Sequence, residues 1–156
     1  HYEPSDRRCT ALISEFIAGM LGTMAFSILF GVPSRYYVYC GLIGSGGWII
    51  YSAAVKVLGP AEASLLATMA VIFFSRLAAV WKRCPVTIFL IAGIFPLVPG
   101  SGIYWTTYYL VTDQLPLALH TGYQAVKCAV AIVFGIVLIF ELPQSLFARL
   151  LRQKNR

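Results

Sequence analysis

From Pro85 to Leu110 the chain runs PVTIFLIAGIFPLVPGSGIYWTTYYL, an apolar stretch without a charged residue. A transmembrane helix needs about 20 mainly apolar residues to cross about 30 Å of hydrocarbon, so this stretch is long enough. Two prolines and two glycines lie around its midpoint, between Ile94 and Gly102. Each proline removes a backbone donor and clashes with the preceding turn. The sequence therefore predicts a membrane span whose helix is broken at Pro96 to Gly102.

Four further stretches are long and apolar enough to span a membrane. They cover about residues 11–30, 37–58, 61–81 and 118–140, and the connectors between spans are short. The chain is 59% hydrophobic and 12% charged, whereas an average soluble domain is roughly 25% charged. We therefore expect an all-α integral membrane protein with about five transmembrane helices. Residues 1–156 are expected to form a single multispan transmembrane domain with a short basic C-terminal tail.

The ends of the first two spans carry proline and glycine. The first is expected to stop at residues 31–33, Gly-Val-Pro, and the second at Gly59-Pro60, because proline disfavours helical geometry in the residue before it. The sequence begins at His1 rather than Met, so preceding residues could be missing. Arg7 and Arg8 precede an apolar run, as in a signal peptide, but this run is about twenty residues long and leads into further spans. A retained first helix is expected.

Basic residues predict the direction of the spans. With five crossings the two termini lie on opposite sides of the membrane. One side carries Arg35, Lys82, Arg83, Arg149, Arg152, Lys154 and Arg156, and the other carries Arg7, Arg8 and Lys56. The positive-inside rule then places the C-terminus in the cytoplasm. Orientation explains the net charge of +6 better than nucleic-acid binding, because no Lys/Arg block occurs outside the last eight residues.

No motif for catalysis, a metal or a cofactor is found. The glycine-rich run at residues 41–47 lacks the Lys-Ser/Thr pair and the strand of a phosphate-binding loop. Like Ala18 and Gly22 in the first span, these small residues are expected to let helices approach closely. The sequence contains no HExxH, GxSxG or paired-carboxylate arrangement, so we expect no enzyme. The cysteines are far apart, which predicts neither a zinc site nor a disulfide framework; they are Cys9, Cys40, Cys84 and Cys128.

Glu15, Arg76 and Lys127 are ionisable residues within the predicted spans, where charges are costly and usually face a cavity. Glu15 and Arg76 are close to the ends of their spans, so extension to the interface explains them as well as a function does. Lys127 lies about two residues from the centre of its span, near the depth of the proline break. We hypothesise that Lys127 and the Ser101 end of the broken helix share a cavity and attract a carboxylate. A structural Lys127–Glu15 pair is the competing explanation.

The break itself has two explanations. Broken helices at the membrane midplane are typical of transporter binding sites, where the positive N-terminal end of a half-helix receives an anionic group. The alternative is a proline kink that serves only packing. On the first explanation the substrate-binding residues are Pro96, Pro99, Gly100, Ser101, Gly102 and Lys127, and Glu15 is a candidate proton carrier.

Two segments resemble a known family. They are FGVP at residues 30–33 followed by CGLIG at residues 40–44, and above all IFPLVPGSG at residues 94–102. They are similar to segments of the threonine/serine exporter family, and the length of the chain is similar to that of the family's small, YjjB-like membrane subunit. The resemblance covers nearly the whole chain, from the first span to the basic tail.

The resemblance implies a multi-pass protein of the bacterial cytoplasmic (inner) membrane that works with a larger membrane subunit. Copies of the chain could also associate within that complex. The solutes that such a family exports include threonine, serine and succinate, all of which carry a carboxylate. We therefore expect a subunit of a secondary transporter that exports small carboxylate-bearing solutes. The rival interpretations are a non-transporting membrane scaffold or assembly subunit, and a channel.

Overall fold

The computed structural model describes residues 4–143. Among these residues the chain forms six α-helices and two short 3-10 helices, without a strand. Their bounds are α1 Pro4–Leu29, η1 Ser34–Tyr36, α2 Tyr37–Ala54, α3 Pro60–Lys82, α4 Thr87–Ile94, η2 Phe95–Leu97, α5 Gly100–Val111 and α6 Leu115–Phe140. Each of the five predicted ranges contains a helix, and the fourth contains two. The basic tail at residues 149–156 lies outside the described residues.

The connections follow from the residues that form them. Gly31 has φ +66°, which glycine adopts without strain, and it lies in the turn between α1 and α2. Pro60 occupies the first turn of α3, where backbone amides have no acceptor within the helix, so a proline there costs no hydrogen bond. Arg83 caps the end of α3 with φ 52°, and Asp113 has φ 61° between α5 and α6. The predicted stop of the first span is confirmed, while α2 ends at Ala54, before the predicted Gly59-Pro60.

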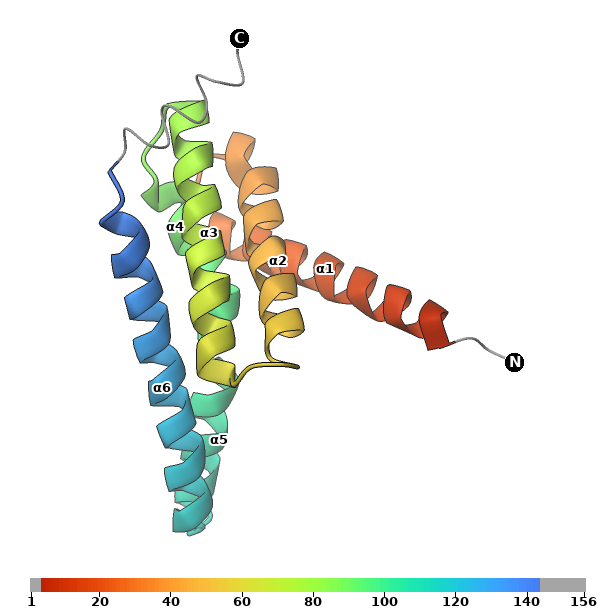
Figure 1. Cartoon of the computed structure of the whole chain (residues 1–156), viewed down its shortest axis with the longest axis vertical. Coiled ribbons are helices and arrows are strands. Elements are labelled where there is room, and N and C mark those ends of the chain that lie inside the picture. Colours follow the sequence, from red (N-terminus) through yellow and green to blue (C-terminus); the bar gives the residue numbers. More distant parts are fainter. Residues whose placement is uncertain (1–3, 144–156) are drawn as a thin grey trace.

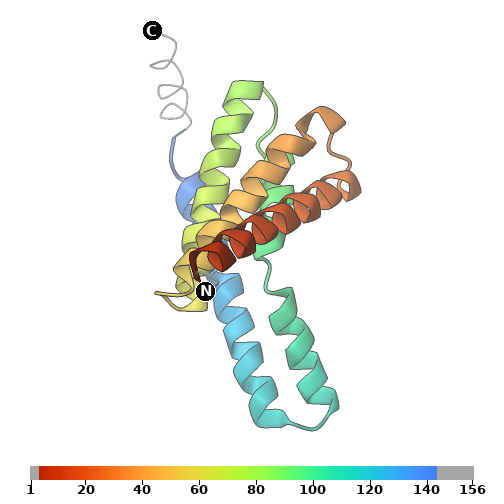
Figure 2. The same ribbon diagram turned by 90° about the vertical axis from the view of Figure 1, so that its right-hand side faces the viewer.

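The helices form a bundle from which two elements extend. In Figure 1, α2, α3 and α6 run side by side, and α1 crosses α2 obliquely and continues away from the bundle. The short α4 packs against α2 and α3. α5 packs mainly on the N-terminal half of α6, and Figure 2 shows this hairpin extending beyond the other helices. Two helices are therefore central: α2 contacts α1, α3 and α4, and α3 contacts α2, α4 and α6.

Lengths and exposures confirm a membrane protein. Three helices, α1, α3 and α6, are long and apolar enough to cross a bilayer, and the bent pair of α4 and α5 makes four if it is one span. Large apolar side chains face outward along α1, α5 and α6; examples are Leu21 at 63%, Val111 at 81% and Leu119 at 65% exposure. Such a surface suits lipid rather than water. The 18-residue α2 is rich in glycine and serine, so its full crossing stays a prediction, as does the single-domain organisation.

Small residues bring α2 close to its neighbours, as the sequence predicts. A Cβ atom on Gly44 would lie 2.2 Å from Oγ1 of Thr23 on α1, and one on Gly47 would lie 2.3 Å from Cγ2 of Val71 on α3. Both positions therefore require glycine. The prediction for α1 is wrong in register: Gly22 has open space around it, and it is Gly19 that approaches α2. Helical spacing explains this, because Gly19 and Thr23 lie one turn apart on one face.

Several hydroxyl groups buried between the helices are bonded locally, whereas Thr68 Oγ1 and Ser75 Oγ on α3 have no hydrogen-bond partner within the described residues. Thr23 Oγ1 donates to the carbonyl of Gly19 at 2.7 Å, Ser27 Oγ donates to that of Thr23 at 2.8 Å, and Ser64 Oγ donates to that of Pro60 at 2.8 Å. In a membrane such bonds are needed because lipid offers no partner. They allow small polar residues to pack helices closely at little cost.

Candidate functional site

The fourth span is broken where the sequence predicts. α4 ends at Ile94, a 3-10 turn covers Phe95–Leu97, and α5 begins at Gly100. Val98 is extended, with φ −60° and ψ 130°, because the residue before a proline is disfavoured in helical geometry. The two helical halves are bent by 45°.

The break leaves the N-terminal end of α5 without a cap. Pro99 occupies the N-cap position and offers no side-chain hydrogen bond. The amide of Ile103 bonds to the carbonyl of Pro99 at 3.1 Å, but within the described residues no backbone acceptor receives the amides of Ser101 and Gly102. Two donors and the positive end of the helix dipole are therefore free to meet an acceptor there.

A pocket of about 300 Å³ lies beside this end of α5. Its walls come from the break, from the first two turns of α5, from one face of α6, from α2, and from a single residue of α3. The lining residues are Pro96, Leu97, Val98, Pro99, Ser101, Gly102, Trp105, His120, Thr121, Gln124, Ala125, Cys128, Trp48, Tyr51 and Ser64. This volume is at the lower end of typical small-molecule sites, so it suits a small solute.

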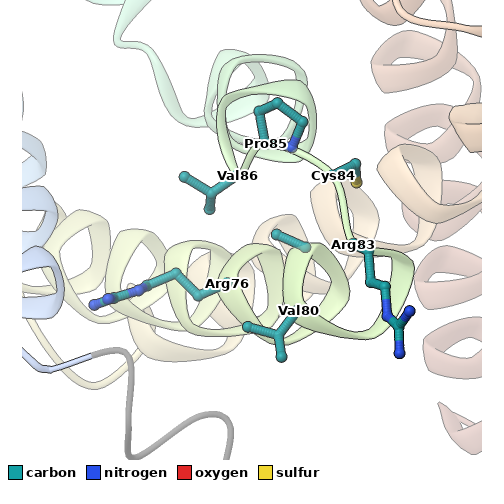
Figure 3. A pocket seen from close by; sticks show the side chains of 7 residues that line it. Arg76, Val80, Arg83, Cys84, Pro85 and Val86 are labelled. Carbon is teal, nitrogen blue, oxygen red and sulfur yellow. The ribbon is translucent and has the colours of Figure 1, made fainter.

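A second pocket, of about 400 Å³, lies at the other end of α3. It is lined by Arg76, Arg83 and the residues that lead into α4, and Figure 3 shows the two arginines pointing away from each other. Arg76 is 6% exposed and donates from Nη1 to the carbonyls of Ile139 and Leu142, the latter at 2.8 Å. It thereby satisfies carbonyls at the end of α6, which is a structural role. We therefore take the pocket at the break as the candidate site.

The structure brings together most of the predicted binding residues. Pro96, Pro99, Ser101 and Gly102 line the pocket, and Gly100 lies in the same turn but outside the lining. All of them belong to the break, so they are close by connectivity.

The remaining predicted residues lie apart from the pocket. Lys127 is exposed on α6, and its Nζ lies 5.6 Å from the centre of the Tyr123 ring. Glu15 on α1 has one buried carboxylate oxygen, Oε2, without a hydrogen-bond partner in the described part of the chain. No ion pair joins Lys127 and Glu15 among the described residues, since the Lys127 ammonium is directed to Tyr123. The roles given to both residues stay predictions.

Several lining residues are absent from the sequence-based prediction. On α6, His120, Gln124 and Cys128 are spaced one turn apart and face the pocket. This polar spacing within an apolar run was a usable signal. Trp48 and Tyr51 of α2 carried no such signal, because aromatic residues are common near the ends of spans.

The hairpin of α5 and α6 holds the far wall of the pocket. A Cβ atom on Gly102 would lie 3.1 Å from Cβ of Ala125, so the helices touch at this glycine. One turn further along α5, Thr106 Oγ1 lies 3.1 Å from Thr121 Oγ1 and bonds to the carbonyl of Gly102 at 2.6 Å. These contacts fix the start of α5 against the pocket face of α6.

Comparison with known proteins identifies the family. The threonine/serine exporter family, ThrE, matches residues 15–141, which include every described helix from α2 to α6 and most of α1. The chain belongs to the threonine/serine exporter family. Its members are transporters, and the predicted resemblance is confirmed.

A curated relative supports this assignment. The threonine/serine exporter of Corynebacterium glutamicum is 30% identical over 129 residues, which cover 83% of this chain and 26% of the relative. The chain thus spans about a quarter of the length of that relative. No solved structure matches the chain.

Proposed function

We propose that this chain is a membrane subunit of a secondary exporter of small carboxylate-bearing solutes, such as threonine, serine or succinate. The observation that carries the proposal is the pocket at the broken span, where α5 presents free amides next to a small polar-aromatic cavity. Hydrogen bonds from the amides of Ser101 and Gly102 would replace those that a solute carboxylate loses when it leaves water. The positive end of the α5 dipole would stabilise its charge further. The chain would supply binding and passage, without catalysis.

The proposal includes a larger membrane subunit as partner. The exporter of Corynebacterium glutamicum is about four times as long as the part that this chain matches, so further segments accompany the matching part in that protein. A separate subunit could supply their counterpart here. The outward apolar face of α1 leaves room for such a partner as well as for lipid.

The proposed location is the bacterial cytoplasmic membrane, with the C-terminus inside. Lys82 at the end of α3 lies 4.4 Å from the ring centre of Tyr39 near the start of α2, which puts Arg35, Lys82 and Arg83 at one end of the bundle. Figure 1 shows the turn between α2 and α3, which contains Lys56, at the opposite end. This grouping supports the positive-inside assignment.

Glu15 is the proposed proton carrier. It is a carboxylate on a membrane helix, and its buried oxygen Oε2 has no partner within the described chain, which leaves this oxygen available to accept a proton. Export that accelerates when a proton gradient is imposed across the membrane is expected. Equal rates with and without the gradient would contradict proton coupling.

Reconstitution tests the function as a whole. The chain is placed in liposomes with and without the proposed larger membrane subunit, and fluxes of threonine, serine and succinate are measured. We expect saturable flux of at least one solute with both subunits. Flux that rises linearly without saturation would indicate a channel, and no flux in either preparation would indicate a scaffold.

A further inference from the structure

Among the described lining residues, only Gln124 has a buried side-chain polar atom without a hydrogen-bond partner. It lies on the pocket face of α6, and its Oε1 atom is buried without a hydrogen-bond partner in the described chain. Two hydroxyl groups of the lining are bonded: Thr121 Oγ1 donates to the carbonyl of Leu117 at 2.9 Å, and Ser64 Oγ donates to that of Pro60. A buried acceptor without a donor is costly, so the amide oxygen is available for a ligand that donates.

The surroundings of Gln124 suit a cationic donor. The indole of Trp48 and the ring of Tyr51 lie side by side, with ring centres 5.6 Å apart, and Trp105 lines another wall. Aromatic faces attract an ammonium group through their quadrupole. The described lining contains no aspartate or glutamate, so the acceptors for an ammonium group are neutral.

Gln124 also lies close to the proposed carboxylate position. Its chain neighbour Ala125 touches Gly102, where an added Cβ would be 3.1 Å from Cβ of Ala125. The acceptor on α6 and the free amides of α5 therefore lie across one helix contact. A small solute that carries a carboxylate and an ammonium group on the same carbon could reach both.

We infer that Gln124 accepts a hydrogen bond from the ammonium group of the exported solute and is a specificity-determining residue of the pocket. This rests on the proposed function and sharpens it. An α-amino acid satisfies both the α5 amides and Gln124. A dicarboxylate such as succinate leaves the amide oxygen facing a second carboxylate, which repels it.

Binding to the purified two-subunit complex tests the inference. The ligands are L-threonine, 3-hydroxybutyrate, which is threonine without its ammonium group, and succinate; binding is followed by calorimetry. Gln124→Met keeps the length of the side chain and removes its acceptor. We expect threonine affinity to fall about tenfold, which corresponds to about 1.4 kcal/mol, and 3-hydroxybutyrate affinity to stay within about twofold.

Two further variants make the result specific. Gln124→Glu replaces the acceptor with a charged one and is expected to retain threonine binding while weakening succinate binding further. Gln114→Leu is the matched control, because the exposed side chain of Gln114 lies outside the pocket lining and donates from Nε2 to Thr112 Oγ1 at 3.3 Å. It is expected to leave all affinities unchanged.

The outcomes separate this inference from the proposed function. If the wild-type complex binds none of the ligands, the proposed function fails. If it binds threonine and Gln124→Met binds threonine equally well, or loses threonine and 3-hydroxybutyrate alike, only the role of Gln124 fails. Loss of threonine binding in a folded Gln124→Glu complex would also overturn it, since the amide would then be acting as a donor.

Discussion

The two halves of the broken span are held differently. α4 is fixed in the bundle: Phe89, Ala92 and Gly93 are buried, and the helix packs on α2 and α3. α5 buries no residue completely and packs mainly on α6. The pocket lies at the joint between them. The proline break therefore joins a fixed half to a peripheral half, so a movement of the α5–α6 hairpin would change the pocket without disturbing the core.

The largest expected difference between the halves is in stability. Phe89 is fully buried, with its ring centre 5.5 Å from that of Tyr36, so Phe89→Ala leaves a cavity. We expect a loss of about 3 kcal/mol, or roughly a hundredfold in the unfolding equilibrium. Ile103 on α5 is 56% exposed, and Ile103→Ala should cost about 0.5 kcal/mol or less. Chemical unfolding in detergent measures both, and equal losses would contradict the difference between the halves.

The second effect is on transport and comes from the joint itself. Replacing Pro96 and Pro99 together by alanine removes penalties of about 3 kcal/mol each against a continuous helix. The amides of Ser101 and Gly102 would then bond within the helix. We expect maximal flux in the reconstituted complex to fall about tenfold or more.

Pro116→Ala is the control for the proline variant. Pro116 lies in the first turn of α6, where proline is tolerated and no break depends on it. Its replacement is expected to leave flux unchanged. Unchanged flux in the Pro96 and Pro99 double variant would show that the break serves packing only.

The third effect is smaller and concerns the contact between α5 and α6. Gly102→Ala places a methyl group 3.1 Å from Cβ of Ala125, whereas Gly100→Ala meets nothing within 4 Å. The first substitution should push the start of α5 away from Gln124 and weaken threonine binding about fivefold, or about 1 kcal/mol. The second should change binding less than about twofold. Similar effects at both glycines would argue against the close contact.

The break in the fourth span could be predicted from the sequence, but the residues that line the pocket could not. Pro96 and Pro99 act on the local backbone, because each lacks an amide donor and its ring clashes with the preceding turn. Their effect can therefore be predicted without a tertiary structure. The lining by Trp48 and Gln124 depends on how α2 and α6 rotate about their axes, which is decided by packing. The glycine contacts show the same dependence on packing. Close packing of the first span was predicted from its small residues, but it was assigned to Gly22, whereas the contact with α2 lies at Gly19.

The smallest expected effect is at Lys127. The sequence placed it near the depth of the break, and depth was the argument for carboxylate binding, but depth does not fix the face of a helix. On α6 the pocket residues recur one turn apart at His120, Gln124 and Cys128, whereas Lys127 is exposed with its Nζ near the ring of Tyr123.

We expect Lys127→Met to change the half-saturating threonine concentration less than about twofold, because substitutions at exposed positions cost little. Measured beside Gln124→Met in the same liposomes, this variant compares two contributions to threonine binding. One is a charge at the depth of the break, and the other is a hydrogen-bond acceptor on the pocket face of α6. A tenfold increase for Lys127→Met alone would mean that Lys127 turns toward the carboxylate in the transporting complex. Such a turn would require α6 to rotate about its axis, since Lys127 lies outside the face of α6 that lines the pocket.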